Sequence, residues 1–181
     1  TESQKKGIKE IENDLISKER MFRVVQGDVG SGKTIVALLT ATNVIESKFQ
    51  CAFMAPTEIL AKQHFELAKK IFKNIKINVA LITGKTDHGK KKEILKNLKD
   101  NKINLIIGTH SLFQKKIEFN KLGFIIIDEQ HKFGVKQRMS LAKKGGNECD
   151  VLLMSATPIP RTMMLTFYGD MDVSKLIEKP A

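Results

Sequence analysis

Eight residues near the start of the chain have the types and spacing needed to bind phosphate. The segment GDVGSGKT, residues 27–34, places Gly27, Gly32, Lys33 and Thr34 in the P-loop pattern. Glycines let consecutive backbone N–H groups curl around phosphate oxygens, and a helix that begins after the loop adds the positive end of its dipole. Lys33 would then reach the β and γ phosphates, while the Thr34 hydroxyl would bind Mg²⁺. The segment predicts a site for nucleotide phosphates.

The weaker interpretation of this segment is a glycine turn that caps a helix and leaves Lys33 in solvent. The fixed spacing after an apolar strand argues against it. We therefore predict that the whole loop binds nucleotide, which assigns this role to Gly27, Asp28, Val29, Gly30, Ser31, Gly32, Lys33 and Thr34.

Two adjacent carboxylates form a second chemical signal, at the end of the apolar segment FIIIDEQH, residues 124–131. Parallel-sheet proteins bind ligands at the carboxyl ends of their strands. Asp128 would hold Mg²⁺ there, and Glu129 would act as the general base that takes a proton from the attacking water. An isolated acidic pair could instead be the solvated end of a strand. The P-loop in the same chain makes this alternative the less favoured interpretation of Asp128 and Glu129. His131 is assigned to coupling rather than to chemistry.

An alternating series of helices and strands must position these motifs. Hydrophobic periodicity predicts helices over 3–17, 34–45, 57–72, 93–98 and 136–143, and strands over 21–25, 51–55, 79–82, 105–107, 124–128 and 151–155. The expected strands are apolar without strict alternation, as in strands buried on both faces. Strands separated by helices predict right-handed crossovers, and hence an α/β fold with a mostly parallel central sheet and helices on both faces.

Composition supports one globular domain and excludes several other classes. The chain has 181 residues, of which 41% are hydrophobic and 28% are charged, so disorder and collagen-like structure are excluded. Apolar runs are too short to span a bilayer, and TESQKKGIKE at the start contains no apolar segment of a secretory signal. The two cysteines, Cys51 and Cys149, each begin an apolar strand, which favours buried free thiols and a reducing cytosol.

The formal net charge of +11 indicates a polyanionic partner such as nucleic acid. Only four of the 31 basic residues are arginine, however. A lysine-rich composition of this kind also follows from AT-rich coding sequence. Charge alone therefore leaves nucleic-acid binding open.

Several motifs together resemble the first motor lobe of superfamily 2 helicases. In order and spacing they are GDVGSGKT, APTEILAKQH (55–64), TGK (83–85), IGTH (107–110), DEQHKFGVKQR (128–138) and SATPIPRT (155–162). More narrowly, DEQH with KFGVKQR, SATPIPRT and YGDMDVS (168–174) is similar to the bacterial ATP-dependent translocases that migrate DNA branches and regress forks. The resemblance implies a RecA-like P-loop NTPase lobe over 1–181, ATP and Mg²⁺ as cofactors, and branched or duplex DNA as partner.

The resemblance also implies roles for individual residues. Gln4 matches part of the adenine-recognition element, although only Thr1 and Gln4 of that element are retained. Segments that grip the nucleic-acid backbone in such motors match Pro56, Thr57, Thr83, Gly84, Thr109 and His110, and Thr57 is also a good helix N-cap. Residues that couple hydrolysis to lobe movement match Gln130, His131, Ser155, Ala156 and Thr157.

The family pattern further predicts that a second motor lobe and a wedge domain are missing from this chain. No arginine here matches the one that a second lobe supplies, so the lobe alone is expected to bind nucleotide as a monomer and to turn over poorly. A bacterial cytoplasmic location is expected. The alternatives are the motor lobe of a transcription-repair coupling translocase, a non-catalytic nucleic-acid-binding module, and another P-loop enzyme such as a small-molecule kinase.

Overall fold

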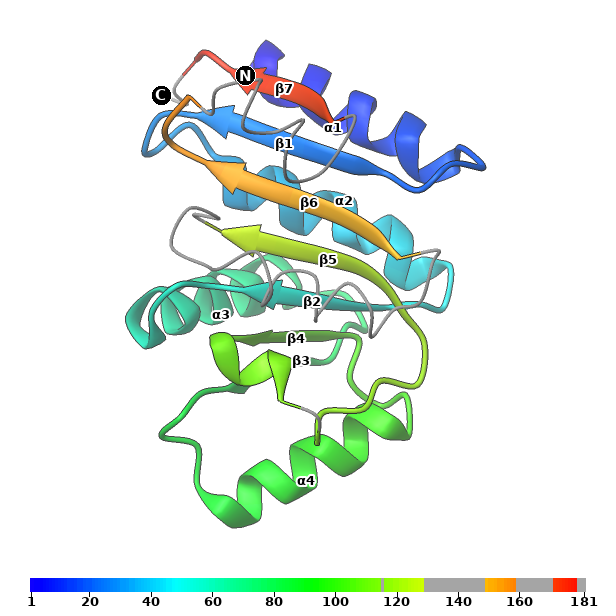
Figure 1. Ribbon diagram of the computed structural model, residues 1–181, viewed down its shortest axis with the longest axis vertical. Helices are drawn as coiled ribbons and strands as arrows, with labels where there is room; N and C mark the ends of the chain where they lie inside the picture. The colour runs from blue at the N-terminus through cyan, green and yellow to red at the C-terminus, as the bar shows by residue number, and fades with distance from the viewer. Residues whose placement is uncertain (115, 129–148, 159–170, 179–181) are drawn as a thin grey trace.

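The protein is described by a computed structural model for residues 1–114, 116–128, 149–158 and 171–178, in which helices and strands alternate (Figure 1). The helices are α1 (Glu2–Ile16), α2 (Lys33–Glu46), α3 (Glu58–Ile71), α4 (His88–Lys99) and the 3-10 helix η1 (His110–Phe113). The strands are β1 (Phe22–Gly27), β2 (Gln50–Met54), β3 (Val79–Ile82), β4 (Leu105–Gly108), β5 (Leu122–Asp128), β6 (Asp150–Ser155) and β7 (Asp172–Leu176). The helix expected over 136–143 lies outside the described residues.

The strands form one seven-stranded sheet in the order β3-β4-β2-β5-β6-β1-β7. Every strand pair described in it is parallel. The strands therefore run in one direction, and their carboxyl ends meet at one edge of the sheet (Figure 1). This confirms the predicted α/β fold class.

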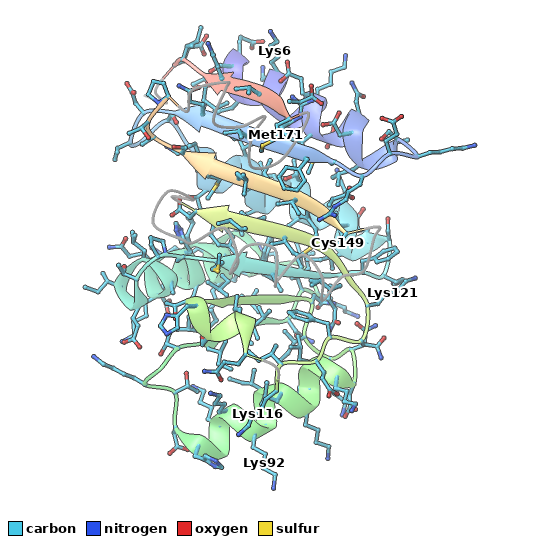
Figure 2. All side chains as sticks on the ribbon, viewed as in Figure 1. Lys6, Lys92, Lys116, Lys121, Cys149 and Met171 are labelled. Carbon is cyan, nitrogen blue, oxygen red and sulfur yellow. The ribbon has the colours of Figure 1, made fainter. Side chains whose placement is uncertain are left out.

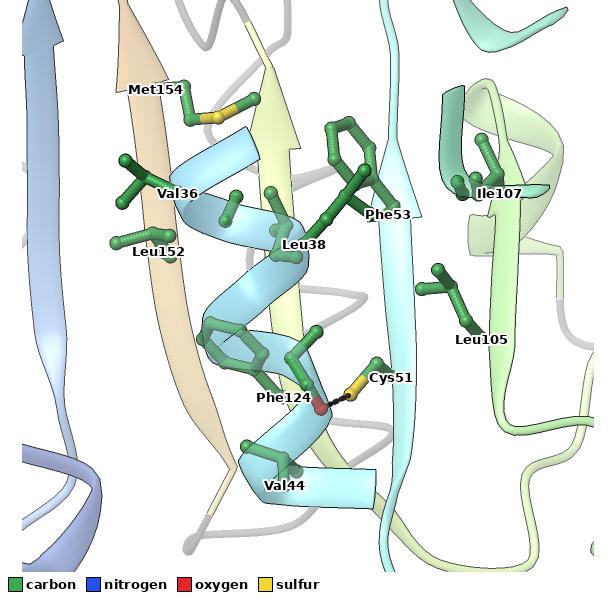
Figure 3. Close-up of a cluster of buried hydrophobic side chains, with 14 of the residues drawn as sticks. Val36, Leu38, Val44, Cys51, Phe53, Leu105, Ile107, Phe124, Leu152 and Met154 are labelled. Atoms are coloured by element: carbon green, nitrogen blue, oxygen red, sulfur yellow. Dashed lines mark hydrogen bonds between the residues drawn. The ribbon is translucent and has the colours of Figure 1, made fainter. Parts of the chain in front are cut away.

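Two hydrophobic clusters cover the two faces of the sheet. On one face α1, α2 and α3 pack against side chains such as Phe53 and Phe124, which are completely buried (Figure 3). On the other face, Ile94 and Leu98 of α4 pack over alternate residues of the same strands. Strands β2, β4 and β5 are buried along their whole length, as expected for strands covered on both sides.

Both cysteines are buried free thiols, as predicted. Cys51 lies in β2 and its Sγ donates weakly to the Ala41 carbonyl at 3.8 Å (Figure 3), while Cys149 directly precedes β6 (Figure 2). Burial raises the pKa of the Cys149 thiol to about 12, and burial raises the pKa of Cys51 well above its usual value. Both thiols are therefore protonated at neutral pH, and their role is in packing.

Helix α4 begins earlier than the sequence predicted, because its first turn carries no apolar periodicity. The Asp87 side chain caps it by accepting from the backbone N–H groups of Gly89 and Lys90 at 3.0 and 3.3 Å. Residues 90–92 of this helix are three consecutive lysines, and Lys90 and Lys92 are exposed to solvent; Lys92 is labelled in Figure 2. Each helix in the described part of the chain is too short or too polar to span a bilayer.

One missed element, β7, is held to the fold by a buried arginine. Arg23 of β1 is 8% exposed, and its Nε donates to Asp14 of α1 at 2.7 Å. Its Nη1 donates to the hydroxyl of Ser174 in β7 at 3.0 Å, and the carboxylates of Glu10 and Asp172 both lie 3.7 Å away. The Ser174 hydroxyl in turn donates to Glu10. This network joins α1, β1 and β7.

We expect Arg23→Met to lower the free energy of unfolding by about 1–3 kcal/mol, because it leaves hydrogen-bonding groups at a buried position without their partner. The partly exposed carboxylates can recover water, so the loss stays below that of a fully buried ion pair. Urea denaturation measures the effect. Lys5→Met is the control, since among the described residues the Lys5 ammonium pairs with the exposed carboxylate of Glu2 alone. An equal loss in both variants would contradict a structural role for the Arg23 network.

Candidate nucleotide-binding site

Three glycines from the end of β1 to the start of α2 cannot be replaced without strain. Gly30 and Gly32 both have φ of 85°, in the left-handed region that disfavours side chains. Gly27 is restricted by packing instead: a Cβ there would lie 2.5 Å from the Ser31 hydroxyl and 2.9 Å from both the Cβ and the carbonyl oxygen of Leu176. The predicted loop therefore has the tight turn that allows a close backbone approach to phosphate.

Lys33 is the first residue of α2, and its side chain folds back over the loop. Its Nζ donates to the carbonyl oxygens of Gly27 at 2.5 Å and Asp28 at 2.9 Å. The first turn of a helix has backbone N–H groups without intrahelical partners, and in α2 these groups follow directly on the loop. An ammonium group beside a helix N-terminus is a combination that binds anionic phosphate.

The first turn of α1 lies against this loop. Gln4 Nε2 donates to the Ser31 carbonyl at 2.9 Å, and a Cβ on Gly32 would be only 2.1 Å from the same nitrogen. Gln4 is held in turn by a capping box with Thr1. The structure therefore brings Gln4, which lies far from the glycine loop in sequence, into direct contact with that loop.

Asp128 ends β5 at the same edge of the sheet. It is level with Met154 of β6, and Met154 is level with Val25, two residues before Gly27. Because β6 alone separates β5 from β1, the backbones at Asp128 and Val25 are two strand spacings apart, about 10 Å. Asp128 is 7% exposed.

The partner of Asp128 was not singled out from the sequence. His64 of α3 places its Nε2 2.8 Å from Asp128 Oδ2, and its ring lies against Phe53 with centroids 4.7 Å apart. The signal that could have found it is helical spacing: Ala61, His64 and Ala68 form the buried stripe of α3. A histidine in such a stripe must find a polar partner in the core.

Three predicted coupling residues are described: Ser155 ends β6, and Ala156 and Thr157 follow it. Thr157 donates its backbone N–H to the Ser155 hydroxyl at 3.2 Å, and that hydroxyl donates to the Thr157 carbonyl at 3.0 Å. Ser155 is level with Gln26 of β1, so Ser155, Ala156 and Thr157 lie between the phosphate loop and the end of β5. Glu129, Gln130 and His131 lie outside the described residues.

The residues predicted to contact DNA occupy the other half of this edge. Pro56 and Thr57 follow β2, Thr109 and His110 follow β4, and Thr83 and Gly84 follow β3, which are neighbouring strands. Thr57 caps α3 by accepting from the Leu60 N–H at 3.2 Å, as predicted. The Thr83 and Thr109 side chains are buried, while Thr57, Gly84 and His110 are exposed.

A cleft of about 780 Å³ lies at the opposite, amino edge of the sheet, lined by the ends of α1 and α2 and by Asp150. Burial raises the pKa of the Asp150 carboxyl, which accepts from the Met21 N–H at 2.8 Å. Glu12 and Glu19 add further acidic groups to this cleft. Lys18 and Arg20 also line this cleft, and none of its described lining residues belongs to the glycine loop, so the candidate phosphate site is the loop between β1 and α2.

The parallel sheet and the glycine loop at its carboxyl edge define a RecA-like P-loop lobe. The sequence profile of DEAD/DEAH box helicases matches residues 1–165. The chain belongs to the DEAD/DEAH box helicase family.

Among named proteins, the chain is similar in sequence and structure to RecG. The chain is 51% identical over 181 residues to the ATP-dependent DNA helicase RecG of Aquifex aeolicus, covering 99% of this chain and 23% of the relative. It is 50% identical over 181 residues to RecG of Streptococcus pneumoniae, covering 100% of this chain and 26% of the relative. A solved structure of RecG bound to a three-way DNA junction has a TM-score of 0.84 and 47% identity, covering 99% of this chain and 24% of that one. The chain thus spans about a quarter of the length of the curated relatives it matches.

We expect Gly27→Ala to lower the free energy of unfolding by about 1–3 kcal/mol and to distort the phosphate loop, because its Cβ meets β7 backbone that cannot move cheaply. Thermal unfolding measures the change. Gly89→Ala is the matched control, since its Cβ would meet only the end of the Asp87 side chain at 3.2 Å. A Gly27→Ala variant as stable as this control would contradict the packing described here.

Proposed function

We propose that this chain is the ATP-binding lobe of an ATP-dependent DNA translocase that acts on duplex and branched DNA, in fork regression and Holliday junction migration. One observation carries the proposal: the phosphate loop and Asp128 occupy one half of the carboxyl edge, and the predicted DNA contacts occupy the other half. The similarity to RecG, of which one solved structure is a complex with a three-way DNA junction, supports DNA as the partner.

ATP and Mg²⁺ fit the residues present. The buried Ser31 hydroxyl has no hydrogen-bond partner within the described residues, which is costly unless a ligand reaches it. The described residues contain no cluster of three His, Cys, Asp or Glu side chains that could cage a metal. Mg²⁺ needs no such cage, because it is held by one or two protein oxygens together with nucleotide phosphates. Thr34 and Asp128 would supply those oxygens, and the ion would neutralise phosphate charge.

The remaining roles in the proposal come from the position of each residue in the family motifs. Lys33 exchanges its bonds to the loop carbonyls for phosphate oxygens when nucleotide binds. Gln4 positions the loop and the adenine base. Glu129 takes the proton from the attacking water. Coupling to the nucleic acid passes through the segment after β6 and through Gln130 and His131.

Slow turnover by the chain alone is part of the proposal. An arginine finger contributes about 10³ to 10⁵ in kcat in phosphoryl transfer. Arg23 is engaged in the network with α1, and Arg20 donates to the Cys149 carbonyl at 2.7 Å at the start of β6. These are the two arginines within the described residues, and their printed partners lie away from the glycine loop, while Arg138 and Arg161 lie outside those residues. In the proposal, a second motor lobe supplies the missing charge. A monomer in the bacterial cytoplasm is the state in which we expect the lobe to act.

We expect Lys33→Ala to weaken binding of Mg²⁺-ADP by at least about tenfold, which corresponds to about 1.4 kcal/mol. The affinity falls because the substitution removes an ammonium group that attracts the negatively charged phosphates. Isothermal titration calorimetry measures the affinity. Lys96→Ala on exposed α4 is the control for removing one positive charge. Equal affinities for wild type and Lys33→Ala would defeat the nucleotide-site assignment.

We expect weak binding to duplex DNA that ignores sequence and falls steeply with salt, because contacts from lysine to phosphate release counterions. Fluorescence anisotropy between 50 and 200 mM salt measures how steeply the affinity falls with salt. A protein with six phosphate contacts loses about 10³ in affinity over this range. Forked DNA should bind no better than duplex. A salt-independent affinity, or a clear preference for forks, would contradict this prediction.

A further inference from the structure

We propose that His64 is a positioning residue for the metal site: it holds the Asp128 carboxylate in the orientation that Mg²⁺ requires. The inference rests on the proposed function, in which Asp128 binds the ion. It adds a residue from α3, the helix that begins at the predicted DNA contact Thr57, to the nucleotide half of the edge.

Contacts of both side chains fix the geometry of the His64–Asp128 pair. An ionised carboxylate can only accept, so His64 Nε2–H donates to Asp128 Oδ2, across 2.8 Å. Both side chains are about 10% exposed. The histidine ring packs on Phe53, which is completely buried in β2. Neither partner can turn away without disturbing the core.

The small residues of α3 explain why the histidine reaches the strand end. Ala61 and Ala68 are completely buried on the same stripe, so the helix lies close to the sheet on either side of His64. The Thr57 cap fixes where the helix begins. Along β5, Phe124 and Ile126 face the cluster under α1, α2 and α3, and alternation places Asp128 on the same face.

Holding one carboxylate oxygen leaves the other available to the ion. Within the described residues, His64 is the one hydrogen-bond partner of the Asp128 side chain. A carboxylate without this bond can rotate or be satisfied by water, so fewer molecules have it oriented for the metal. Partners of this kind change metal affinity by about 10- to 100-fold when they are removed.

The test measures ADP affinity by calorimetry twice, with Mg²⁺ and with EDTA. His64→Leu keeps most of the side-chain volume but cannot donate, and we expect it to weaken Mg²⁺-ADP binding about tenfold while ADP in EDTA changes less than about twofold. His64→Gln, whose amide can donate to the same oxygen, should restore most of the affinity. Gln63→Leu, on the exposed side of the same helix, is the matched control and should behave as wild type.

The outcomes separate this inference from the proposed function. Two results for His64→Leu would overturn the positioning role: an unchanged Mg²⁺-ADP affinity, or an equal loss of affinity with Mg²⁺ and with EDTA. Neither result would contradict the assignment of the nucleotide site in the wild-type chain. A wild-type chain that binds no nucleotide would overturn the proposed function and the inference with it. If His64→Leu does not fold, His64→Met replaces it, because the flexible thioether side chain fills irregular core space.

Discussion

The register of β6 between β1 and β5 is the constraint on which the rest of the site depends. Backbone hydrogen bonds keep Val25 level with Met154 and Met154 level with Asp128. Parallel pairing sends all carboxyl ends to one edge, and a shift of one residue would turn every following side chain to the opposite face. The phosphate loop and the acidic strand end therefore face a common space because the core of the sheet sets the register.

Helices then fix individual side chains at this edge. The first turn of α1 supports the phosphate loop through Gln4, and the Arg23 network holds α1 to β1 and β7. Helix α3 reaches the end of β5 through His64. The same helix begins next to the segment that follows β3, where Lys85 Nζ lies 3.6 Å from a carboxylate oxygen of Glu58. In the proposed function, a displacement of α3 by nucleic acid would move His64 and so change its hydrogen bond to Asp128.

Local signals predicted most of the fold but not its long-range contacts. The glycine loop is readable from sequence because its pattern is contiguous, and the buried strands because each is a continuous apolar run. Strand β7 was missed because only Ser174 and Leu176 of its five residues are buried, which is typical of an edge strand and weak as a pattern. The strand order is set by pairing between distant segments, so local periodicity does not contain it.

The candidate site shows the same contrast between local motifs, which the sequence predicts, and long-range contacts, which it does not. Motif spacing predicted which strand ends carry its residues, and the common edge is now seen for those that the structure describes. The bond from Gln4 to the Ser31 carbonyl and the bond from His64 to Asp128 join residues 27 and 64 positions apart, so neither could be deduced from spacing. His64 was visible as part of a motif, but its partner depends on how close α3 lies to the sheet.

The most direct measurement is amide hydrogen exchange of the chain with and without Mg²⁺-ADP. If the carboxyl edge is the nucleotide site, exchange slows in the peptide covering residues 27–34, and the peptide covering residues 43–49 at the amino-edge cleft is unchanged. Slower exchange at the amino-edge cleft with none in the glycine loop would contradict the account.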